Sequence, residues 1–451
     1  MSKQVARQVR AAIISGRLRP GDRLPASRAW ARELGVARGT LTTALEVLTA
    51  EGVLEARVGA GTFVTQAAPP PEGPPPETKA PPPPRVLPFP AIDAAASEGI
   101  DLRPCRPCVE DFPIDLWRRC LGLAAHTLPS PDYGDPRGEP ELREEIATHL
   151  RRARGLSAHV DEIIVTHGAV HAMHLLASLY LSASSSVVFE EPGYPLARQI
   201  FTLTGAQIHL CEVDEHGLRT EQLPRGEPNV DLAYVTPSHQ FPMGGRLSLA
   251  RRRDLIAWAT QASCVIVEDD YDGEFRYDVA PLAPLASLAP HTVVYCGTFS
   301  KTMFPGLRLG FAVAPRPIVE AMAALRATAE YAPSTPLQRA LTFFLREGHY
   351  ARHVHRMRRK YAQRRRVVAE VLDGLRAPAA LLGLDSGLSV CLRLSSPCAR
   401  ALSAAARSRG VLIPTLDTYR SRPSDEDATL VCGYAASSPE ALERGLHLVF
   451  S

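Results

Sequence analysis

The stretch Tyr295-Cys-Gly-Thr-Phe-Ser-Lys-Thr-Met-Phe-Pro-Gly-Leu-Arg-Leu-Gly-Phe311 joins an apolar strand to a cluster of polar groups. The strand breaks into hydroxyl groups, a lysine, a Pro-Gly turn and an arginine. The amine of Lys301 can form an imine with an aldehyde. Its neighbours Thr298, Ser300 and Arg308 can hold a phosphate. A lysine for a Schiff base and an anion site beside it are what pyridoxal 5'-phosphate requires.

The same stretch resembles the T-F-S-K-x-x-x-P-G-L-R-x-G lysine motif of fold-type I aminotransferase-like domains. The resemblance implies that Lys301 is the catalytic residue and that it binds pyridoxal phosphate together with Thr298, Ser300 and Arg308. A lone Ser-Lys pair would instead indicate a surface turn. The full pattern favours the cofactor site.

Two further segments indicate phosphate contacts. The turn Thr166-His-Gly-Ala-Val170 leads into a helix whose N-terminal N–H groups make an anion site. It resembles the T-S-G-A-Q-Q turn of aminotransferase-like domains, which implies phosphate binding by the backbone at Gly168 and Ala169. Tyr133-Gly-Asp-Pro-Arg-Gly138 resembles the Y-G-D-x-x-G segment, whose tyrosine reaches the phosphate in the partner subunit. Tyr133 therefore implies a homodimer.

Polar residues that follow other strands complete the expected ring site. Glu268-Asp-Asp-Tyr-Asp-Gly-Glu-Phe-Arg-Tyr277 places a carboxylate at the end of a strand, where it can keep a pyridine nitrogen protonated. By resemblance, Asp269 has this role, Tyr271 binds the ring hydroxyl and Tyr194 stacks on the ring. Tyr234-Val-Thr-Pro-Ser-His-Gln-Phe-Pro-Met-Gly244 lacks the usual ring-contacting asparagine. Either His239 or Gln240 is a candidate replacement.

One departure from the aminotransferase pattern concerns the ligand carboxylate. Aminotransferases bind the substrate α-carboxylate with an arginine near a late segment that corresponds here to Leu430-Val-Cys-Gly-Tyr-Ala435, and this segment has no arginine. Arg198, Arg420 and Arg422 are candidate effector-binding substitutes.

The segments around these motifs predict an α/β domain. Strands and helices alternate from about residue 115, which favours a largely parallel sheet with crossover helices. A basic stretch, His349–Arg366, is expected to be a helix with a solvated face. The predicted strands are Ile163–Thr166, Ser186–Phe189, Ala206–Leu210, Leu232–Thr236, Val265–Glu268, Val293–Cys296 and Gly310–Val313.

The N-terminal segment predicts a winged helix-turn-helix. Apolar residues at helical spacing indicate helices over Val5–Ser15 and Val36–Ala50, and a shorter helix between them with Ser27 as its N-cap. Val53–Val64 is expected to form two strands around a glycine-rich wing. Residues 1–66 carry ten basic and five acidic side chains, whereas the rest of the chain is slightly acidic. The head is therefore the part that would meet a polyanion.

This head resembles the GntR family over nearly all of residues 4–64, through S-G-R-L-x-P-G-D-R-L-P-x-S-R, E-L-G-V-x-R-x-T, A-L-x-x-L-x-A-E-G and G-x-G-T-F-V. The resemblance implies binding to double-stranded DNA. Arg28 and Arg38 would face phosphates and bases from helix starts, Thr40 and Thr42 would face the major groove, and Gly61 would lie in the wing.

Composition sets the remaining bounds. The chain has 451 residues with a formal charge of +3, and its three parts are predicted as a DNA-binding domain at 1–66, a Pro-rich linker at 67–90 and an aminotransferase-like domain at 91–451. The linker favours extended polyproline II. Nine scattered cysteines favour a reducing cytoplasm, and no apolar run predicts a membrane span. Cys105-Arg-Pro-Cys108 has no second pair beside it, so no metal is predicted.

Taken together, the chain resembles the MocR subfamily of GntR-type regulators. This resemblance implies a transcriptional regulator that depends on pyridoxal phosphate and senses an amine, an amino acid or pyridoxal phosphate itself. Physiological turnover is not expected, although a transaminase half-reaction is open. One alternative is an active aminotransferase with an accessory DNA-binding head. The other is a regulator whose large domain serves only for dimerisation.

Overall fold

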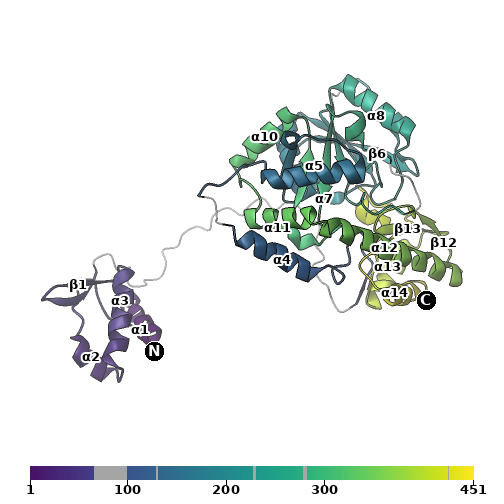
Figure 1. Cartoon of the computed structure of the whole chain (residues 1–451). Helices are drawn as coiled ribbons and strands as arrows, with labels where there is room; N and C mark the ends of the chain where they lie inside the picture. Colours follow the sequence, from purple (N-terminus) through teal and green to yellow (C-terminus); the bar gives the residue numbers. More distant parts are fainter. Residues whose placement is uncertain (66–98, 128–130, 227–229, 278–281, 425) are drawn as a thin grey trace. The chain divides into compact units, whose positions relative to one another are not determined.

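Contacts within the chain separate it into two units, Met1–Asp93 and Ala94–Ser451. The computed structural model describes residues 1–65, 99–127, 131–226, 230–277, 282–424 and 426–451 (Figure 1). The Pro-rich linker predicted at 67–90 lies outside the described residues. Among the residues that are described, no helix has the length and apolarity needed to cross a membrane.

The N-terminal unit is built on a small apolar core. Leu41, Ala44 and Leu48 lie on one face of the third helix and are fully buried, because their spacing places them one above another. They pack with apolar residues of the first helix and of the wing. The described elements are α1 (Ser2–Ile14), α2 (Ser27–Glu33), α3 (Arg38–Ala50) and the antiparallel strands β1 (Leu54–Arg57) and β2 (Gly61–Val64).

The predicted N-cap of the second helix was wrong by one position. Ser27 is the first residue of α2, and Ala26 occupies the cap position without a side-chain hydrogen bond. The helix still begins where the chain leaves the turn after Pro25, because Ala26 has extended backbone angles (φ −57°, ψ 133°). A serine near a helix start therefore indicated the boundary of α2 and not the cap itself.

The large unit contains a mixed sheet of eight strands in the order β4-β11-β10-β9-β8-β5-β6-β7. Its central strands β10, β9, β8, β5 and β6 run parallel, as the alternation of strands and helices predicted. β11 is antiparallel to both neighbours, because it returns directly from β10 through the lysine turn. The strands are β4 (Ile163–Thr166), β5 (Ser186–Glu191), β6 (Gln207–Asp214), β7 (Gly217–Leu218), β8 (Leu232–Val235), β9 (Val265–Asp269), β10 (Val293–Thr298) and β11 (Gly310–Val313).

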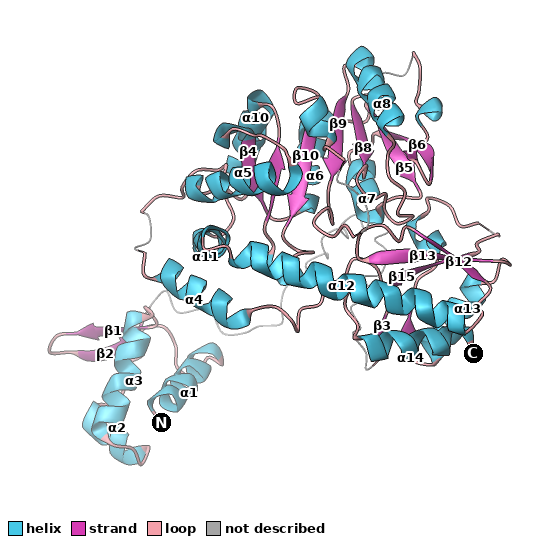
Figure 2. Ribbon diagram, turned by 45° about the vertical axis from the view of Figure 1, so that its right-hand side comes forward, coloured by secondary structure: helices cyan, strands magenta, loops and turns pink. Residues whose placement is uncertain are grey.

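Helices cover both faces of this sheet, which explains why its strands are apolar throughout rather than alternating (Figure 2). In β9, Val267 packs with the helices of one face and Ile266 with those of the other. The first face carries α6 (Ala169–Tyr180), α7 (Pro195–Leu203) and α10 (Arg316–Ala327). The second carries α5 (Pro140–Arg154), α8 (Leu249–Ala262), α11 (Thr335–Arg346) and α12 (His349–Gly374).

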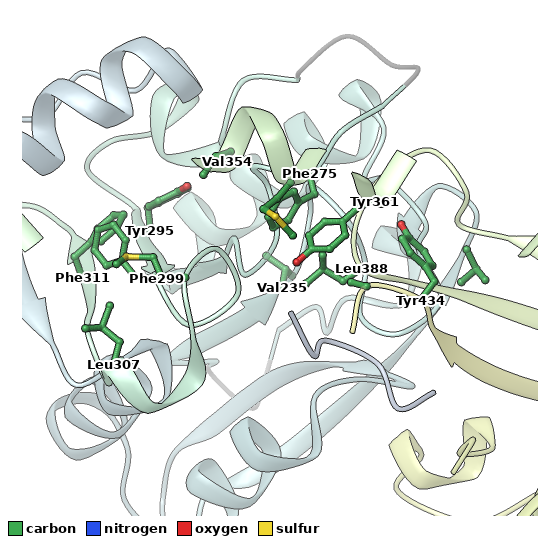
Figure 3. Packing of buried hydrophobic residues seen from close by; sticks show 14 of the residues in the cluster. Val235, Phe275, Tyr295, Phe299, Leu307, Phe311, Val354, Tyr361, Leu388 and Tyr434 are labelled. Atoms are coloured by element: carbon green, nitrogen blue, oxygen red, sulfur yellow. The ribbon is translucent and has the colours of Figure 1, made fainter. Parts of the chain in front are cut away.

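The second face contains the larger core cluster (Figure 3). Phe299, from the lysine turn, packs against Phe311 of β11 with ring centroids 5.7 Å apart and meets Tyr350 of α12 edge to face at 5.6 Å. Tyr295 lies beside Phe311 at 6.3 Å. These contacts fix the turn that carries Lys301 against the sheet.

The C-terminal part forms a smaller antiparallel sheet of β12 (Ala379–Leu382), β13 (Ser389–Leu394) and β15 (Thr429–Gly433). It packs with α13 (Ala399–Ser408) and α14 (Pro439–Phe450). A distant segment joins this region, because β3 (Ile100–Asp101) pairs in parallel with β14 (Val411–Leu412). The remaining described α-helices are α4 (Ile114–Ala125), which lies against α11, and the short α9 (Leu285–Leu288).

The basic helix α12 is not simply a solvated face. Tyr350, His353 and Tyr361 lie on its buried side. The guanidinium of Arg364 is also buried and donates to the carbonyl oxygen of Ala435. Four-residue spacing places one row of side chains against the core while the other basic residues face outward. The expectation of a solvated helix therefore holds for only part of its surface.

Gly433 sets the distance between β15 and the segment that follows β3. Its N–H donates to the carbonyl oxygen of Leu102 at 2.7 Å, and a Cβ there would overlap the carbonyl of Arg103. Only glycine allows the two backbones to approach this closely.

We predict that Gly433→Ala lowers the free energy of unfolding by about 1–3 kcal/mol, because the added methyl group forces the two backbones apart. Gly122→Ala is the matched control, since a Cβ at this helical glycine meets no atom within 4 Å. The control should be neutral or more stable by up to about 1 kcal/mol. Urea unfolding followed by circular dichroism measures both, and equal stabilities would show that the close approach is not required.

Candidate functional site

The candidate site lies at the carboxyl ends of the central parallel strands. Asp269 is the last residue of β9, and Lys301 follows the end of β10. The two strands are neighbours, with Cys296 opposite Asp269 in the register. The crevice at the carboxyl ends of parallel strands is where open α/β sheets bind ligands.

Lys301 is half-buried, and its amine donates a hydrogen bond of 2.9 Å to the carbonyl oxygen of Cys105. Cys105 has φ 60°, in the left-handed region that non-glycine residues rarely adopt. The segment after β3 thus presents a backbone acceptor to the lysine. Burial raises the pKa of the Cys105 thiol to about 12, and the charge of Lys301 acts in the opposite direction.

Asp269 is a buried carboxylate with one free oxygen. It is 4% exposed, and its Oδ2 accepts a hydrogen bond of 2.7 Å from the hydroxyl of Tyr234. Its Oδ1 has no hydrogen-bond partner in the described part of the chain. Burial raises the pKa of Asp269 to about 7, although the bond from Tyr234 and the charge of Lys301 lower it. A protonated ring nitrogen of a ligand fits this donor-seeking oxygen.

Tyr234 was not among the predicted site residues. It is fully buried in β8 and stacks on Phe189 with ring centroids 4.9 Å apart and an interplanar angle of 9°. Its position in an otherwise aliphatic strand, one strand away from an acidic strand end, was the available sequence signal. Tyr234 orients the carboxylate of Asp269.

The candidate anion site lies at the N-terminus of α6. Gly168 has φ 87° and precedes Ala169, the first residue of the helix. The backbone of Arg308 is also in the left-handed region, with φ 53°. Its Nη2 donates to the carbonyl oxygen of His167 at 2.8 Å. A Cβ on Gly168 would lie 3.6 Å from its Nη1. The guanidinium thus stands beside helical N–H groups, which is an arrangement suited to phosphate.

The hydroxyl-bearing residues of the lysine turn support that site. The Oγ1 of Thr298 accepts from the backbone N–H of Ser300 at 3.2 Å, and Ser300 is buried. These contacts hold the turn between β10 and Lys301 in a defined conformation.

Two histidines flank the helix N-terminus and share one carboxylate. Glu330 lies 2.8 Å from Nε2 of His171 and 3.5 Å from Nε2 of His167. Burial and then the charge of Arg326 lower the pKa of His171 to about 3, so this ring is neutral at physiological pH. The positive charge at the anion site therefore comes from Arg308 and the backbone.

The aromatic residues of the predicted ring site lie in one apolar cluster. Tyr271 and Phe241 belong to it, and Tyr194 packs on Phe241 edge to face at 5.7 Å. His239 and Gln240 have different partners within the chain, and which of them takes the place of the ring-contacting asparagine stays a prediction. Gln240 donates from Nε2 to Glu190 and to two backbone carbonyls, whereas His239 contacts Tyr271.

Other predicted residues lie apart from this cluster or have different partners. Tyr133 is 78% exposed and packs on Tyr331 at 5.1 Å.

The guanidinium of Arg198 donates to the carbonyl oxygens of Tyr419 and Arg420 at 3.4 and 2.8 Å. Arg422 is exposed, and Nε of Arg420 is 3.8 Å from Asp417. The effector-binding assignment of Arg198, Arg420 and Arg422 remains a prediction.

The head presents basic and hydroxyl groups at its helix starts. Arg28 and Arg38 are exposed, at the second residue of α2 and the first of α3. Thr42 is exposed on α3, one turn after Arg38, and donates to its carbonyl oxygen at 3.0 Å, while Thr40 is half-buried. Gly61 has φ 113° at the start of β2 in the wing. Helix N-termini with exposed arginines suit phosphate contacts.

Comparison with known proteins agrees with both parts of this geometry. Residues 126–448 match the family "Aminotransferase class I and II", and residues 1–64 match "Bacterial regulatory proteins, gntR family". The α-aminoadipate aminotransferase LysN from Thermus thermophilus, solved with N-(5'-phosphopyridoxyl)-L-leucine, aligns over 78% of this chain and 91% of its own with a TM-score of 0.70 and 25% identity.

Two curated relatives match over nearly the whole length. The chain is 33% identical to the probable rhizopine catabolism regulatory protein MocR of Rhizobium meliloti, over 99% of this chain and 92% of the relative. It is also 33% identical to the HTH-type pyridoxine biosynthesis transcriptional regulator PdxR of Corynebacterium glutamicum, over 97% of this chain and 93% of the relative. The chain belongs to this family of HTH-type transcriptional regulators, in which a gntR-type head precedes an aminotransferase class I and II domain.

The pKa of Asp269 generates a prediction for the protein without ligand. Its value of about 7 in the folded state exceeds the ordinary 3.8, so folding takes up a proton and stability falls as pH rises from about 4 to about 7. Asp269→Asn should remove this part of the fall and make the apoprotein more stable at pH 8 by roughly 1–3 kcal/mol. Urea unfolding at pH 5 and pH 8 tests this.

The pH dependence of the unfolding free energy is compared between the variant and the wild type. The other buried carboxylates are present in both proteins, so the difference reports on Asp269. Pyridoxal phosphate at pH 8 should reverse the order by stabilising the wild type more than Asp269→Asn. If the variant is less stable than wild-type apoprotein at both pH values, the carboxylate is satisfied within the protein and is not waiting for a ligand.

Proposed function

We propose that this regulator binds pyridoxal 5'-phosphate in its large unit and double-stranded promoter DNA through its head. A small amine, an amino acid or pyridoxal phosphate itself would change DNA binding by reacting or binding at Lys301. The observation that carries the proposal is that the buried Oδ1 of Asp269, beside Lys301, has no hydrogen-bond partner among the residues that the structure describes. An acidic oxygen of this kind is costly unless a ligand supplies a donor.

The residues fit the cofactor group by group. Lys301 supplies the amine, Arg308 and the backbone at Gly168 and Ala169 supply the anion site, and Asp269 supplies the partner for a pyridine nitrogen. Thr298 and Ser300 shape the turn, while Tyr271 and Tyr194 line the ring. When bound, pyridoxal phosphate supplies an aldehyde that condenses with amines and a ring that withdraws electrons.

Sensing is favoured over turnover by the surroundings of the site. Aminotransferases hold the substrate carboxylate with an arginine, and the corresponding strand β15 here contributes Val431 to an apolar cluster with Phe241 and Tyr419. Arg198 is engaged with backbone carbonyls that hold the segment around Tyr419. An arginine engaged in this way is not free to bind a carboxylate without breaking those bonds.

A homodimer is part of the proposal. The ring of Tyr133 is mostly exposed next to Tyr331, where a second subunit can bury it. Two copies would bring two heads to repeated half-sites on DNA. We also place the protein in the cytoplasm, because a transcriptional regulator must have access to the DNA that it binds.

We predict that Lys301→Ala abolishes covalent capture of pyridoxal phosphate by borohydride and removes the ligand response, while operator binding persists, because the head is untouched. Arg316→Ala is the control, since this exposed arginine pairs with Glu320 on α10. Mass spectrometry after reduction and operator binding with and without cofactor and amines give the readouts. Capture at another lysine in the variant, or an unchanged response, would refute the assignment.

The head predicts a salt-dependent interface. Removal of Arg28 or Arg38 by alanine substitution should weaken binding to a fragment of the promoter region next to its own gene. Each lost phosphate contact should flatten the slope of log K against log salt by roughly 0.9. Arg10→Ala is the control, because Arg10 pairs with Glu51 at 2.5 Å. Fluorescence anisotropy at several salt concentrations measures the slopes, and identical slopes for all variants would place the DNA face elsewhere.

A further inference from the structure

His239, Asp272 and Tyr271 form a buried group of polar side chains in the candidate site. Nδ1 of His239 is 2.8 Å from Oδ2 of Asp272 and 2.9 Å from the hydroxyl of Tyr271. His239 is 3% exposed and Asp272 is 2% exposed. His239 was a candidate for ring contact, whereas Asp272 had no predicted role. An arrangement with one nitrogen between two oxygens raises the question of which atom holds each proton.

The acceptor chemistry of a carboxylate answers this question. A carboxylate oxygen accepts, so the contact with Asp272 places a proton on Nδ1 of His239. A protonated Nδ1 has no lone pair for the Tyr271 hydroxyl. The phenolic oxygen therefore accepts from the shared N–H, and its own proton is left for another acceptor.

The charges around the pair are consistent with this assignment. Burial alone lowers the pKa of His239, but Asp272, the backbone of Gly383 and Asp385 outweigh it and raise the pKa. Burial and then the charge of Asp272 raise the pKa of Tyr271, so the phenol keeps its proton. Cys105 and Asp269 act in the same direction, and so does hydrogen bonding with Asp272, whose carboxylate is therefore within reach of the phenol as a competing acceptor.

Backbone packing holds the histidine ring in place. A Cβ on Gly387 would overlap the His239 ring and the Asp272 carboxylate. The hydroxyls of Tyr277 and Tyr434 both donate to the carbonyl oxygen of Gly387 at 2.7 Å, which fixes the loop against the ring. Packing of this density leaves His239 little freedom to rotate.

We propose that His239, held by Asp272, is a positioning residue that aims the phenolic proton of Tyr271 at the cofactor ring oxygen. Asp272 is the competing acceptor for that proton, and the imidazole N–H occupies its Oδ2. Without His239, the phenol turns to the carboxylate and away from the cofactor. The inference rests on the proposed binding of pyridoxal phosphate at Lys301.

The test measures the pH at which the visible absorption of protein-bound pyridoxal phosphate changes. A hydrogen bond from Tyr271 stabilises the negative ring oxygen and so lowers this midpoint. Tyr271→Phe should raise the midpoint by about 1–2 pH units, the value of a charge-assisted hydrogen bond. His239→Leu should raise it to a similar extent. His239→Asn, which can place an amide N–H near the Nδ1 position, should restore most of the wild-type midpoint.

Two comparisons separate positioning from general damage. In the Tyr271→Phe background, His239→Leu should add no further change, because its effect passes through the lost hydroxyl. His149→Leu is the matched control, since it removes another histidine bonded to a carboxylate of the same loop, Glu274, at 2.8 Å. That control should leave the midpoint unchanged.

Each outcome is decisive for one claim. A wild-type protein that captures no pyridoxal phosphate overturns the proposed function. If the wild type captures it, two results would overturn the positioning role. One is a His239→Leu midpoint equal to that of wild type. The other is a His239→Leu shift that persists when the Tyr271 hydroxyl is absent. If His239→Leu does not fold, Asp272→Asn replaces it. This variant frees the imidazole to accept from Tyr271 and should also raise the midpoint, whereas no change would contradict the proposal.

Discussion

An ionisable carboxylate buried without a full set of partners is the constraint on which the site depends. Asp269 lies at the end of β9, where Tyr234 bonds one oxygen and the other has no partner among the described residues. Burial favours the neutral acid and raises its pKa to about 7. The buried carboxylate therefore destabilises the fold when it is ionised, and a cationic donor from a ligand would offset this destabilisation.

Strand geometry explains why Asp269 faces a different environment from Glu268 and Asp270. Successive side chains of β9 point to opposite faces, so Glu268 and Asp270 lie on the face away from Tyr234. There Glu268 accepts from the N–H groups of Leu285 and Ala286, and Asp270 pairs with Arg154 and accepts from Tyr295 at 2.5 Å. The two flanking acids have partners from the protein. Asp269 lies on the opposite face, where its Oδ1 has no partner among the described residues.

Much of the fold could be predicted because the central strands are buried on both faces and read as short apolar runs. Ile163–Thr166 and Gly310–Val313 coincide with β4 and β11. The antiparallel direction of β11 could not be read from composition, since it follows from the short return through the lysine turn. In the candidate site, the motifs predicted roles for Lys301 and Asp269, and the structure places both at the ends of neighbouring strands.

The contacts of Gln240, His239 and Arg198 required the tertiary structure. Their partners come from segments far away in the chain, and spacing carries no information about such pairs. The sequence alone could have predicted that Asp269 and its acidic neighbours lie on opposite faces, because side chains alternate along a strand. The partner that holds it, Tyr234, could not have been identified without the order of the strands.

The hydrogen bond from Lys301 to Cys105 connects this chemistry to the smaller sheet. Cys105 follows β3, whose partner β14 belongs to the C-terminal part, and the carbonyl of Leu102 accepts from Gly433 of β15. The lysine amine is thus bonded to a segment that the smaller sheet holds in place through its backbone. A ligand that takes up the amine removes the donor from the Cys105 carbonyl, whose residue already has an unfavourable left-handed conformation. Such a loss biases the segment toward another arrangement only if the ligand binds the two arrangements with different affinity. The structure provides the contact through which such a bias could act, since the amine of Lys301 is bonded to a backbone oxygen of a segment that is held by the smaller sheet.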